Sequence, residues 1–193
     1  MEETELLYQA GLSAEWVHEF VTESNKIDPQ PGLSEPGELV YDGHREAVMY
    51  AIKMASESRF ALPHSVHRLL LRDHLLAGKL RRREKKIGLN HLLPVADVPY
   101  FMWEWNRSVQ RVVNMLRLQK NTELEQRVFE VWELHCKFEN IHPYDLYNGK
   151  VGRVLTINHS LLVGVEPCII LCKGREQYFD LIRDHSSAAL AAS

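Results

Sequence analysis

Apolar residues recur at spacings of three and four along most of the chain, which is the period of an amphipathic α-helix. The clearest stripes cover residues 98–116 and 124–138, with charged residues on the remaining faces. Asn121 or Thr122 can cap the second of these helices, because acidic residues follow in its first turn. The first stripe consists of Val98, Phe101, Met102, Trp105, Val109, Val112, Val113 and Leu116. The second consists of Leu124, Val128, Val131, Trp132, His135 and Phe138.

Shorter stretches with the same period predict four further helices. They cover residues 48–55, 67–75, 151–162 and 175–185. Residues 28–43 are rich in proline and glycine and therefore predict a loop. Residues 78–94 predict an extended segment or a short β-hairpin, and the small residues 186–193 predict a frayed end. The pattern predicts an all-α fold, and no change of composition divides residues 1–193 into more than one domain.

Composition and charge narrow the class of protein. Of the 193 residues 45% are hydrophobic and 25% are charged, which is the balance of a soluble globular protein. The net charge of −3 argues against nucleic-acid binding, which depends on excess Lys and Arg. The first residues are acidic, unlike those of a signal peptide, and no apolar run is long enough to span a bilayer. Since three cysteines are too few for a disulfide framework, we expect a cytoplasmic protein with no nucleic-acid or membrane partner.

The segment after residue 138 carries the candidate chemistry. Pro143 disfavours a helical backbone at the preceding residue, so His142 is expected at the corner between a helix and a loop. A histidine on such a rigid element suits a general base, because imidazole can accept a proton from a hydroxyl nucleophile. In isolation a histidine here is more often a surface or capping residue, so its neighbours decide the interpretation.

Six residues later a helix start offers an anion site. Asn148 and Gly149 open the next helix, whose free N–H groups suit a bound anion. Lys150 and Arg153 are three residues apart and can face the same anion. The helix N-terminus itself does not stabilise cations, so a bound phosphate would explain why two of them lie there. The alternative is a plain helix cap in which these cations pair with acids such as Asp145.

This segment resembles the motif of the Fic family, which is His-Pro-Phe, any residue, an acid, Gly-Asn-Gly-Arg, two residues and Arg. The acid of the motif is replaced by Leu146 and its first glycine by Tyr147. The resemblance extends over nearly the whole chain from residue 20, including the helices before and after the motif. The matching residues are His142, Pro143, Asn148, Gly149 and Arg153, with Tyr144 and Lys150 as near matches.

The resemblance implies an all-α Fic domain that transfers AMP from ATP to a hydroxyl side chain of a target protein. In that family His142 would be the catalytic base, and residues 78–94 would be the flap that docks the backbone of the target protein. The motif's acid holds a divalent ion there, but Leu146 cannot ligate Mg²⁺, which requires oxygen ligands. ATP is therefore the expected substrate and a Mg²⁺ cofactor is in doubt. The implied phosphate-binding residues are Asn148, Gly149, Lys150 and Arg153.

An N-terminal segment resembles the family's inhibitory helix. Residues 15–30 contain Ser24 and, four positions later, Asp28, where the family has Ser or Thr followed by Glu. The resemblance implies regulation in which Asp28 approaches Arg153 and hinders placement of ATP. The alternative is that Asp28 merely ends a helix before Pro29.

Other residues support simpler interpretations. The basic residues 81–86 predict a solvated charged face, or alternatively a surface that attracts an acidic target. His135 lies on an apolar stripe and is expected to be a core residue, as is Trp105. Trp103 is expected to be partly buried, with a place on a partner surface as the alternative. No histidine lies among cysteines or acids at zinc-ligand spacing, so we assign no metal site.

Two functions fit the whole pattern. The first is a protein-modifying transferase of Fic type that acts on ATP, with weak, altered or self-inhibited activity. The second is a Fic-like domain with a decayed site, which serves as a nucleotide-binding or partner-binding regulatory module. The replaced residues Leu146 and Tyr147 favour the second, and the preserved His142, Gly149 and Arg153 favour the first.

Overall fold

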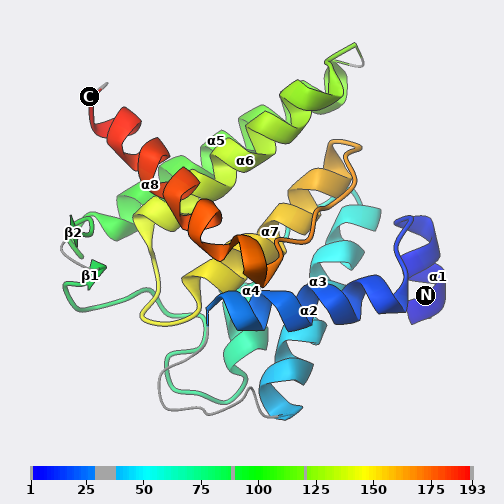
Figure 1. Cartoon of the computed structure of the whole chain (residues 1–193), viewed down its shortest axis with the longest axis horizontal. Coiled ribbons are helices and arrows are strands. Elements are labelled where there is room, and N and C mark those ends of the chain that lie inside the picture. The colour runs from blue at the N-terminus through cyan, green and yellow to red at the C-terminus, as the bar shows by residue number, and fades with distance from the viewer. Residues whose placement is uncertain (1, 29–37, 88–89, 120, 192–193) are drawn as a thin grey trace.

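The computed structural model describes residues 2–28, 38–87, 90–119 and 121–191. Helices dominate these residues, which confirms the predicted all-α class (Figure 1). None of the described helices is both long enough and apolar enough to cross a membrane. The helices are α1 (Glu3–Gln9), α2 (Ala14–Ile27), α3 (Glu38–Ser56), α4 (Pro63–Leu71), α5 (Val98–Leu118), α6 (Leu124–Ile141), α7 (Asn148–Leu162), η1 (Cys172–Gly174) and α8 (Arg175–Ala191).

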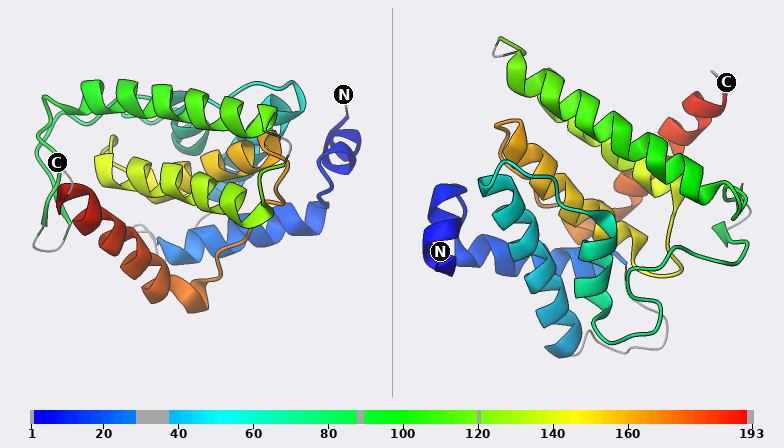
Figure 2. Two further views of the ribbon diagram at one scale, coloured as in Figure 1. Left: turned by 90° about the horizontal axis from the view of Figure 1, so that it is seen from above. Right: turned by 180° about the vertical axis from the view of Figure 1, so that it is seen from behind.

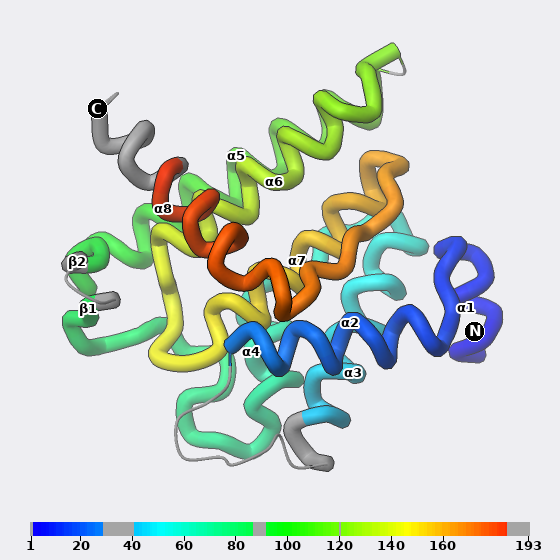
Figure 3. Tube along the Cα trace, in the orientation of Figure 1, coloured from blue at the N-terminus to red at the C-terminus, as the bar shows by residue number. Residues whose placement is uncertain are grey.

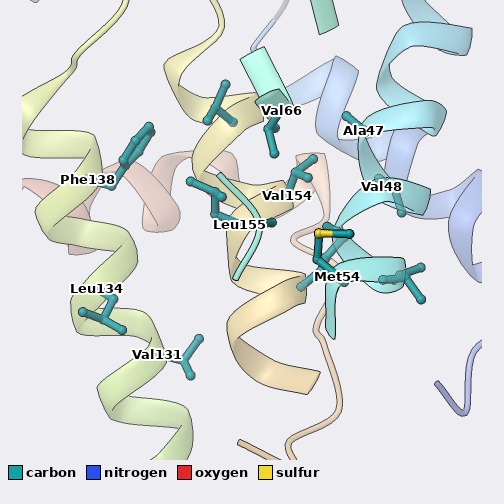
Figure 4. Close-up of a cluster of buried hydrophobic side chains, with 14 of the residues drawn as sticks. Ala47, Val48, Met54, Val66, Val131, Leu134, Phe138, Val154 and Leu155 are labelled. Carbon is teal, nitrogen blue, oxygen red and sulfur yellow. The ribbon is translucent and has the colours of Figure 1, made fainter. Parts of the chain in front are cut away.

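Helix α7 forms the centre of the core. It packs against α3, α4 and α6, and more narrowly against α2 and α5. Figure 4 shows Leu134 and Phe138 of α6 on one side of α7, near Leu155, and Val48 of α3 on the other. All four of these side chains are almost completely buried. A helix enclosed in this way holds the residues of its first turn in fixed positions relative to its neighbours.

Helices α5 and α6 form an antiparallel pair, and α8 packs against the side of α6 opposite α5 (Figure 2). Trp105 joins the pair because its indole Nε1 donates to the backbone oxygen of Leu134 at 2.8 Å. Its side chain is buried, as predicted. Trp103 faces outward with 53% of its surface exposed, so it is partly covered, as expected. It lies on the solvent side of α5, where Arg107 covers its ring.

Three predicted boundaries were wrong. The loop predicted over residues 28–43 stops earlier than expected, because α3 already begins at Glu38. Gly43 lies inside α3, where a Cβ atom would be only 2.7 Å from the backbone oxygen of Leu69, so this glycine permits the close packing of α3 and α4. Helix α4 ends at Leu71, because Arg72 has a φ of 47°. Helix α8 continues to Ala191 beyond the predicted end. The remaining part of that loop, residues 29–37, lies outside the described residues.

The segment between α4 and α5 contains the predicted hairpin. Strands β1 (Lys86–Ile87) and β2 (Asn90–His91) pair antiparallel, with Lys86 opposite His91. The tube in Figure 3 shows this segment beside the loop that joins α6 to α7, and it shows the end of α2 near the start of α7. The two segments that flank the candidate site therefore come from distant parts of the chain.

Candidate functional site

His142 lies at the corner where α6 ends, as the sequence predicted. It adopts the left-handed conformation, with φ 48° and ψ 59°, and its backbone N–H donates to the oxygen of Phe138 at 3.1 Å. Pro143 excludes a continuing helix, which explains the sharp end. The conformation is strained for a residue with a side chain, so the surrounding contacts must hold it in place.

The imidazole of His142 is largely buried, and burial lowers its pKa from 6.5 to about 3. The charges of Lys85 and Arg81 contribute to this lower pKa, while the nearby backbone of Glu139 opposes the change. Nδ1 has no hydrogen-bond partner among the described residues. The ring is therefore neutral at pH 7, which is the form that accepts a proton.

Asn148 closes the loop that follows His142. Its side-chain Oδ1 accepts from the backbone N–H of Tyr144 at 2.8 Å, and its Nδ2 donates to the oxygen of the same residue at 2.8 Å. The amide is thus used to fix the loop in this state. Tyr144 itself is buried and stacks on His67 with 3.9 Å between ring centroids. His67 in turn contacts the backbone oxygen of Leu146 through Nε2 at 3.1 Å, so the loop is held along its whole length.

The first turn of α7 brings two buried cations together. Lys150 and Arg153 are each only 2% exposed. The Lys150 Nζ donates to the backbone oxygen of Asp28 at 3.1 Å and lies 4.6 Å from the centre of the Tyr147 ring. Burial lowers the Lys150 pKa from 10.5 to about 8, an effect that Asp28 opposes and Arg153 increases. No salt bridge engages either cation in the described part of the chain.

Arg153 is held by α2 and α8. Its Nε donates to Ser24 Oγ at 2.8 Å and its Nη2 to the backbone oxygen of Ser24 at 3.0 Å. Its Nη1 donates to the Tyr178 hydroxyl at 3.3 Å. All three acceptors are neutral. Ser24, which the sequence assigned to a regulatory segment, is therefore in direct contact with the last arginine of the motif.

Asp28 lies near Arg153, because a Cβ atom on Gly149 would be 3.5 Å from Asp28 Oδ2 and 2.8 Å from Arg153 Nη1. Within the described residues Asp28 makes no ion pair with Arg153. The guanidinium of Arg153 is bound by Ser24 instead. Its carboxylate lies beside Gly149, where Oδ2 would be 3.5 Å from a Cβ atom. A backbone hydrogen bond from Lys150 fixes this end of α2. The carboxylate therefore stands at the helix start that the sequence predicted for an anion.

The two replaced motif positions have clear structural consequences. Leu146 packs against the hydrophobic core. Tyr147 is buried and adopts φ 62° and ψ 21°, a left-handed conformation that favours the glycine it replaces. Over the described residues no group of three or more His, Cys, Asp or Glu side chains is placed to hold a metal ion.

The solvated face predicted for residues 81–86 was wrong at Arg81 and Lys85, which turn toward the site. Arg81 is buried and donates through Nε to the backbone oxygen of His142 at 2.9 Å and through Nη2 to that of Leu93. The Nζ of Lys85 donates to the backbone oxygen of Asp145. Arg82 remains exposed, as a solvated face requires. No spacing rule separates the buried basic residues of this run from their exposed neighbours.

A second set of buried polar side chains, Glu139 and His135 of α6, lies next to Gly152. Glu139 Oε1 is inaccessible to solvent and has no hydrogen-bond partner within the described chain. Burial raises the Glu139 pKa from 4.5 to about 7, while Arg153 lowers it and Asp28 raises it. His135 is a core residue, as predicted, and its Nε2 lies 2.9 Å from the Tyr178 hydroxyl. Gly152 makes room for this group, because a Cβ there would lie 2.5 Å from Glu139 Oε1.

Comparison with known proteins identifies the fold. No family model and no curated protein matches the chain. A solved structure does: a Fic domain containing signaling protein from Bacteroides thetaiotaomicron VPI-5482, with a TM-score of 0.69. The match covers 94% of this chain and 81% of that one, at 16% sequence identity. This chain has the Fic-domain fold. Because one fold serves several functions, the functional argument rests on the residues at the start of α7.

Proposed function

We propose that this protein is a Fic-type transferase that moves a nucleotide-derived phosphate group, AMP by resemblance, from ATP to a hydroxyl side chain of a target protein. The observation that carries the proposal is the pair of buried cations, Lys150 and Arg153, whose hydrogen-bond acceptors are all neutral. Burying charges without direct counter-charges is costly, so such a pair suits a site that receives an anion. Phosphate groups of ATP are anions of the required kind.

His142 would act as the general base. The target hydroxyl oxygen forms a bond to the α-phosphorus of ATP, the bond from that phosphorus to the bridging oxygen breaks, and pyrophosphate leaves. The hydroxyl proton passes to the neutral imidazole of His142. Burial and two nearby cations hold the His142 pKa at about 3 in the present state. Phosphate charges bound close to the ring would raise that pKa and strengthen the base.

We propose further that the present state is self-inhibited by the end of α2. Ser24 binds the guanidinium of Arg153, and Asp28 places a backbone oxygen on Lys150 and a carboxylate beside Gly149. A nucleotide phosphate would have to displace these groups. The contacts of α2 with the start of α8 support this arrangement, since Arg175 Nε donates to the backbone oxygen of Ile27 at 2.6 Å.

Label transfer from α-labelled ATP tests the proposal. Wild type, Asp28→Ala and His142→Ala are incubated with cell-lysate proteins as acceptors, with and without Mg²⁺. We expect label on acceptor protein that is stronger for Asp28→Ala and absent for His142→Ala. Label that never exceeds the His142→Ala background, for either of the other proteins, contradicts the transferase proposal.

A decayed regulatory module is the second candidate function. It is favoured by the motif loop, because Leu146 offers no metal ligand and Tyr147 places a bulky ring over Lys150. Exposed aromatic side chains of α5, including Tyr100 and Trp103, would then belong to a partner surface. Absence of both label transfer and ATP binding supports this second candidate.

A further inference from the structure

Mg²⁺ does not fit the residues at this site. The motif position that holds a divalent ion in the Fic family carries Leu146, whose side chain packs into the core. The neighbouring Asp145 accepts a hydrogen bond from Lys85 on its backbone oxygen. Protein-bound Mg²⁺ is held by one or two carboxylates together with phosphate oxygens and water, and Leu146 offers no such ligand at the motif position. A nucleotide bound here needs another source of positive charge.

Lys85 lies where such a charge is needed. Its Nζ reaches the motif loop at Asp145, and its charge acts on both His142 and Asp28. Desolvation lowers the Lys85 pKa, whereas Asp145 and Asp28 raise it and Arg81 lowers it. The ammonium group is thus partly withdrawn from water and surrounded by residues of the motif and of α2. Lys85 belongs to the segment between α4 and α5, which lies outside the motif.

Three cations therefore contact the motif loop and the start of α7. Lys85, Lys150 and Arg153 all donate to neutral oxygens, and no salt bridge engages any of them in the described part of the molecule. The salt bridges that do form, such as the one between Arg72 and Glu46, lie on the surface. The carboxylate of Asp28 lies among these cations, beside Gly149. It occupies the place that a phosphate would take.

We propose that this site binds the phosphates of its nucleotide without a divalent metal ion, and that Lys85 supplies the charge that the ion supplies in the Fic family. The inference rests on the proposed function and specifies its cofactor requirement. A lysine is a point charge that neutralises phosphate without demanding octahedral geometry. Together with Lys150 and Arg153 it gives three positive charges for a polyphosphate chain.

Equilibrium binding of ATP and of inorganic triphosphate tests the inference separately from transfer. Both ligands are titrated into wild type and Asp28→Ala, in excess EDTA and in Mg²⁺. The same titrations are made with Lys85→Met and Lys85→Arg in the Asp28→Ala background. Lys86→Met is the matched control, because the neighbouring Lys86 side chain is exposed. Thermal melting of each variant checks that it folds.

We expect equal affinity for ATP in EDTA and in Mg²⁺. Loss of a charged hydrogen-bond donor should make Lys85→Met bind about tenfold or more weakly, whereas Lys85→Arg and Lys86→Met should keep their affinity. Triphosphate should follow the same order. Retained binding without label transfer supports this inference while it contradicts the transferase proposal.

Three results overturn the inference. Binding that requires Mg²⁺ contradicts it and leaves the transferase proposal intact. Metal-independent binding that Lys85→Met does not weaken removes the role of Lys85. No binding of either ligand by wild type or Asp28→Ala contradicts both proposals. If Lys85→Met fails to fold, the comparison of EDTA with Mg²⁺ in Asp28→Ala still decides the question.

Discussion

The guanidinium of Arg153 is bound on two nitrogens by Ser24, a residue 129 positions earlier in the chain. Nε donates to the Ser24 hydroxyl at 2.8 Å and Nη2 to its backbone oxygen at 3.0 Å. Both residues are 2% exposed. Because the contact joins α2 to the first turns of α7, displacement of α2 must free the arginine.

Ser24→Ala removes one of these two bonds and leaves the buried Nε of Arg153 without its acceptor. The variant should lose about 1–3 kcal/mol in its free energy of unfolding, the usual effect of an unsatisfied buried donor. If the self-inhibition proposal holds, the variant should also bind ATP more tightly than wild type. Urea denaturation and ATP titration measure the two effects. Ser56→Ala is the control, because its hydroxyl bonds only within α3 at an exposed position. Lower affinity for ATP would contradict self-inhibition.

Gly152→Ala should destabilise the protein although alanine is the better helix former. The added Cβ would lie 2.5 Å from Glu139 Oε1 and 2.9 Å from His135 Cε1, so α6 and α7 must move apart. Overpacking of this kind costs about 1–3 kcal/mol, against about 1 kcal/mol gained in helix propensity. Urea denaturation measures the balance. Gly174→Ala is the control, because its nearest neighbour would be 3.7 Å away. A Gly152→Ala protein more stable than wild type would mean that Glu139 moves aside freely.

Tyr178→Phe tests the contact between α8 and the site. The Tyr178 hydroxyl accepts from Arg153 Nη1 and lies 2.9 Å from His135 Nε2, and the ring is buried. Its removal leaves both partners unsatisfied, so we expect a loss of about 1–3 kcal/mol in the free energy of unfolding. Tyr8→Phe, at a position that is 81% exposed, should leave stability unchanged. Equal stability of the two variants would show that neither partner depends on the hydroxyl.

Stability should fall as the pH is lowered from 6.5 toward 4. Burial lowers the pKa of five histidines: to about 3 in His135 and His142, to about 4 in His67 and His159, and well below 6.5 in His44. In this window the unfolded chain binds protons that the folded chain does not, so each histidine lowers stability by up to about 1.4 kcal/mol per pH unit. Glu139 acts in the opposite direction, because its pKa is raised to about 7. The five histidines together outweigh the single effect of Glu139. Urea midpoints at pH 7 and pH 5 measure the difference, and a higher midpoint at pH 5 would refute the prediction.

Much of the fold could be predicted because helix signals are local. The apolar stripe from Val98 to Leu116 and the pair Asn148-Gly149 specify helices through the spacing of neighbouring residues. The end of α6 before Pro143 follows from a steric rule that involves two adjacent residues. The start of α3 at Glu38 could not be predicted in this way, because Gly43 serves the packing of α3 on α4 and has no local helix signal.

For the candidate site, too, some features follow from the local sequence and others from tertiary packing. The sequence by itself determined which residues are the candidates for the chemistry, since His142, Lys150 and Arg153 follow one another at fixed spacing along two helix ends. Only the tertiary structure decided what surrounds them: Ser24 on Arg153 and Lys85 on the motif loop. These contacts join residues about 60 to 130 positions apart, and they depend on how whole helices pack. Packing selects a few partners from many chemically equivalent residues, so Lys85 differs from Lys86 only in the folded protein.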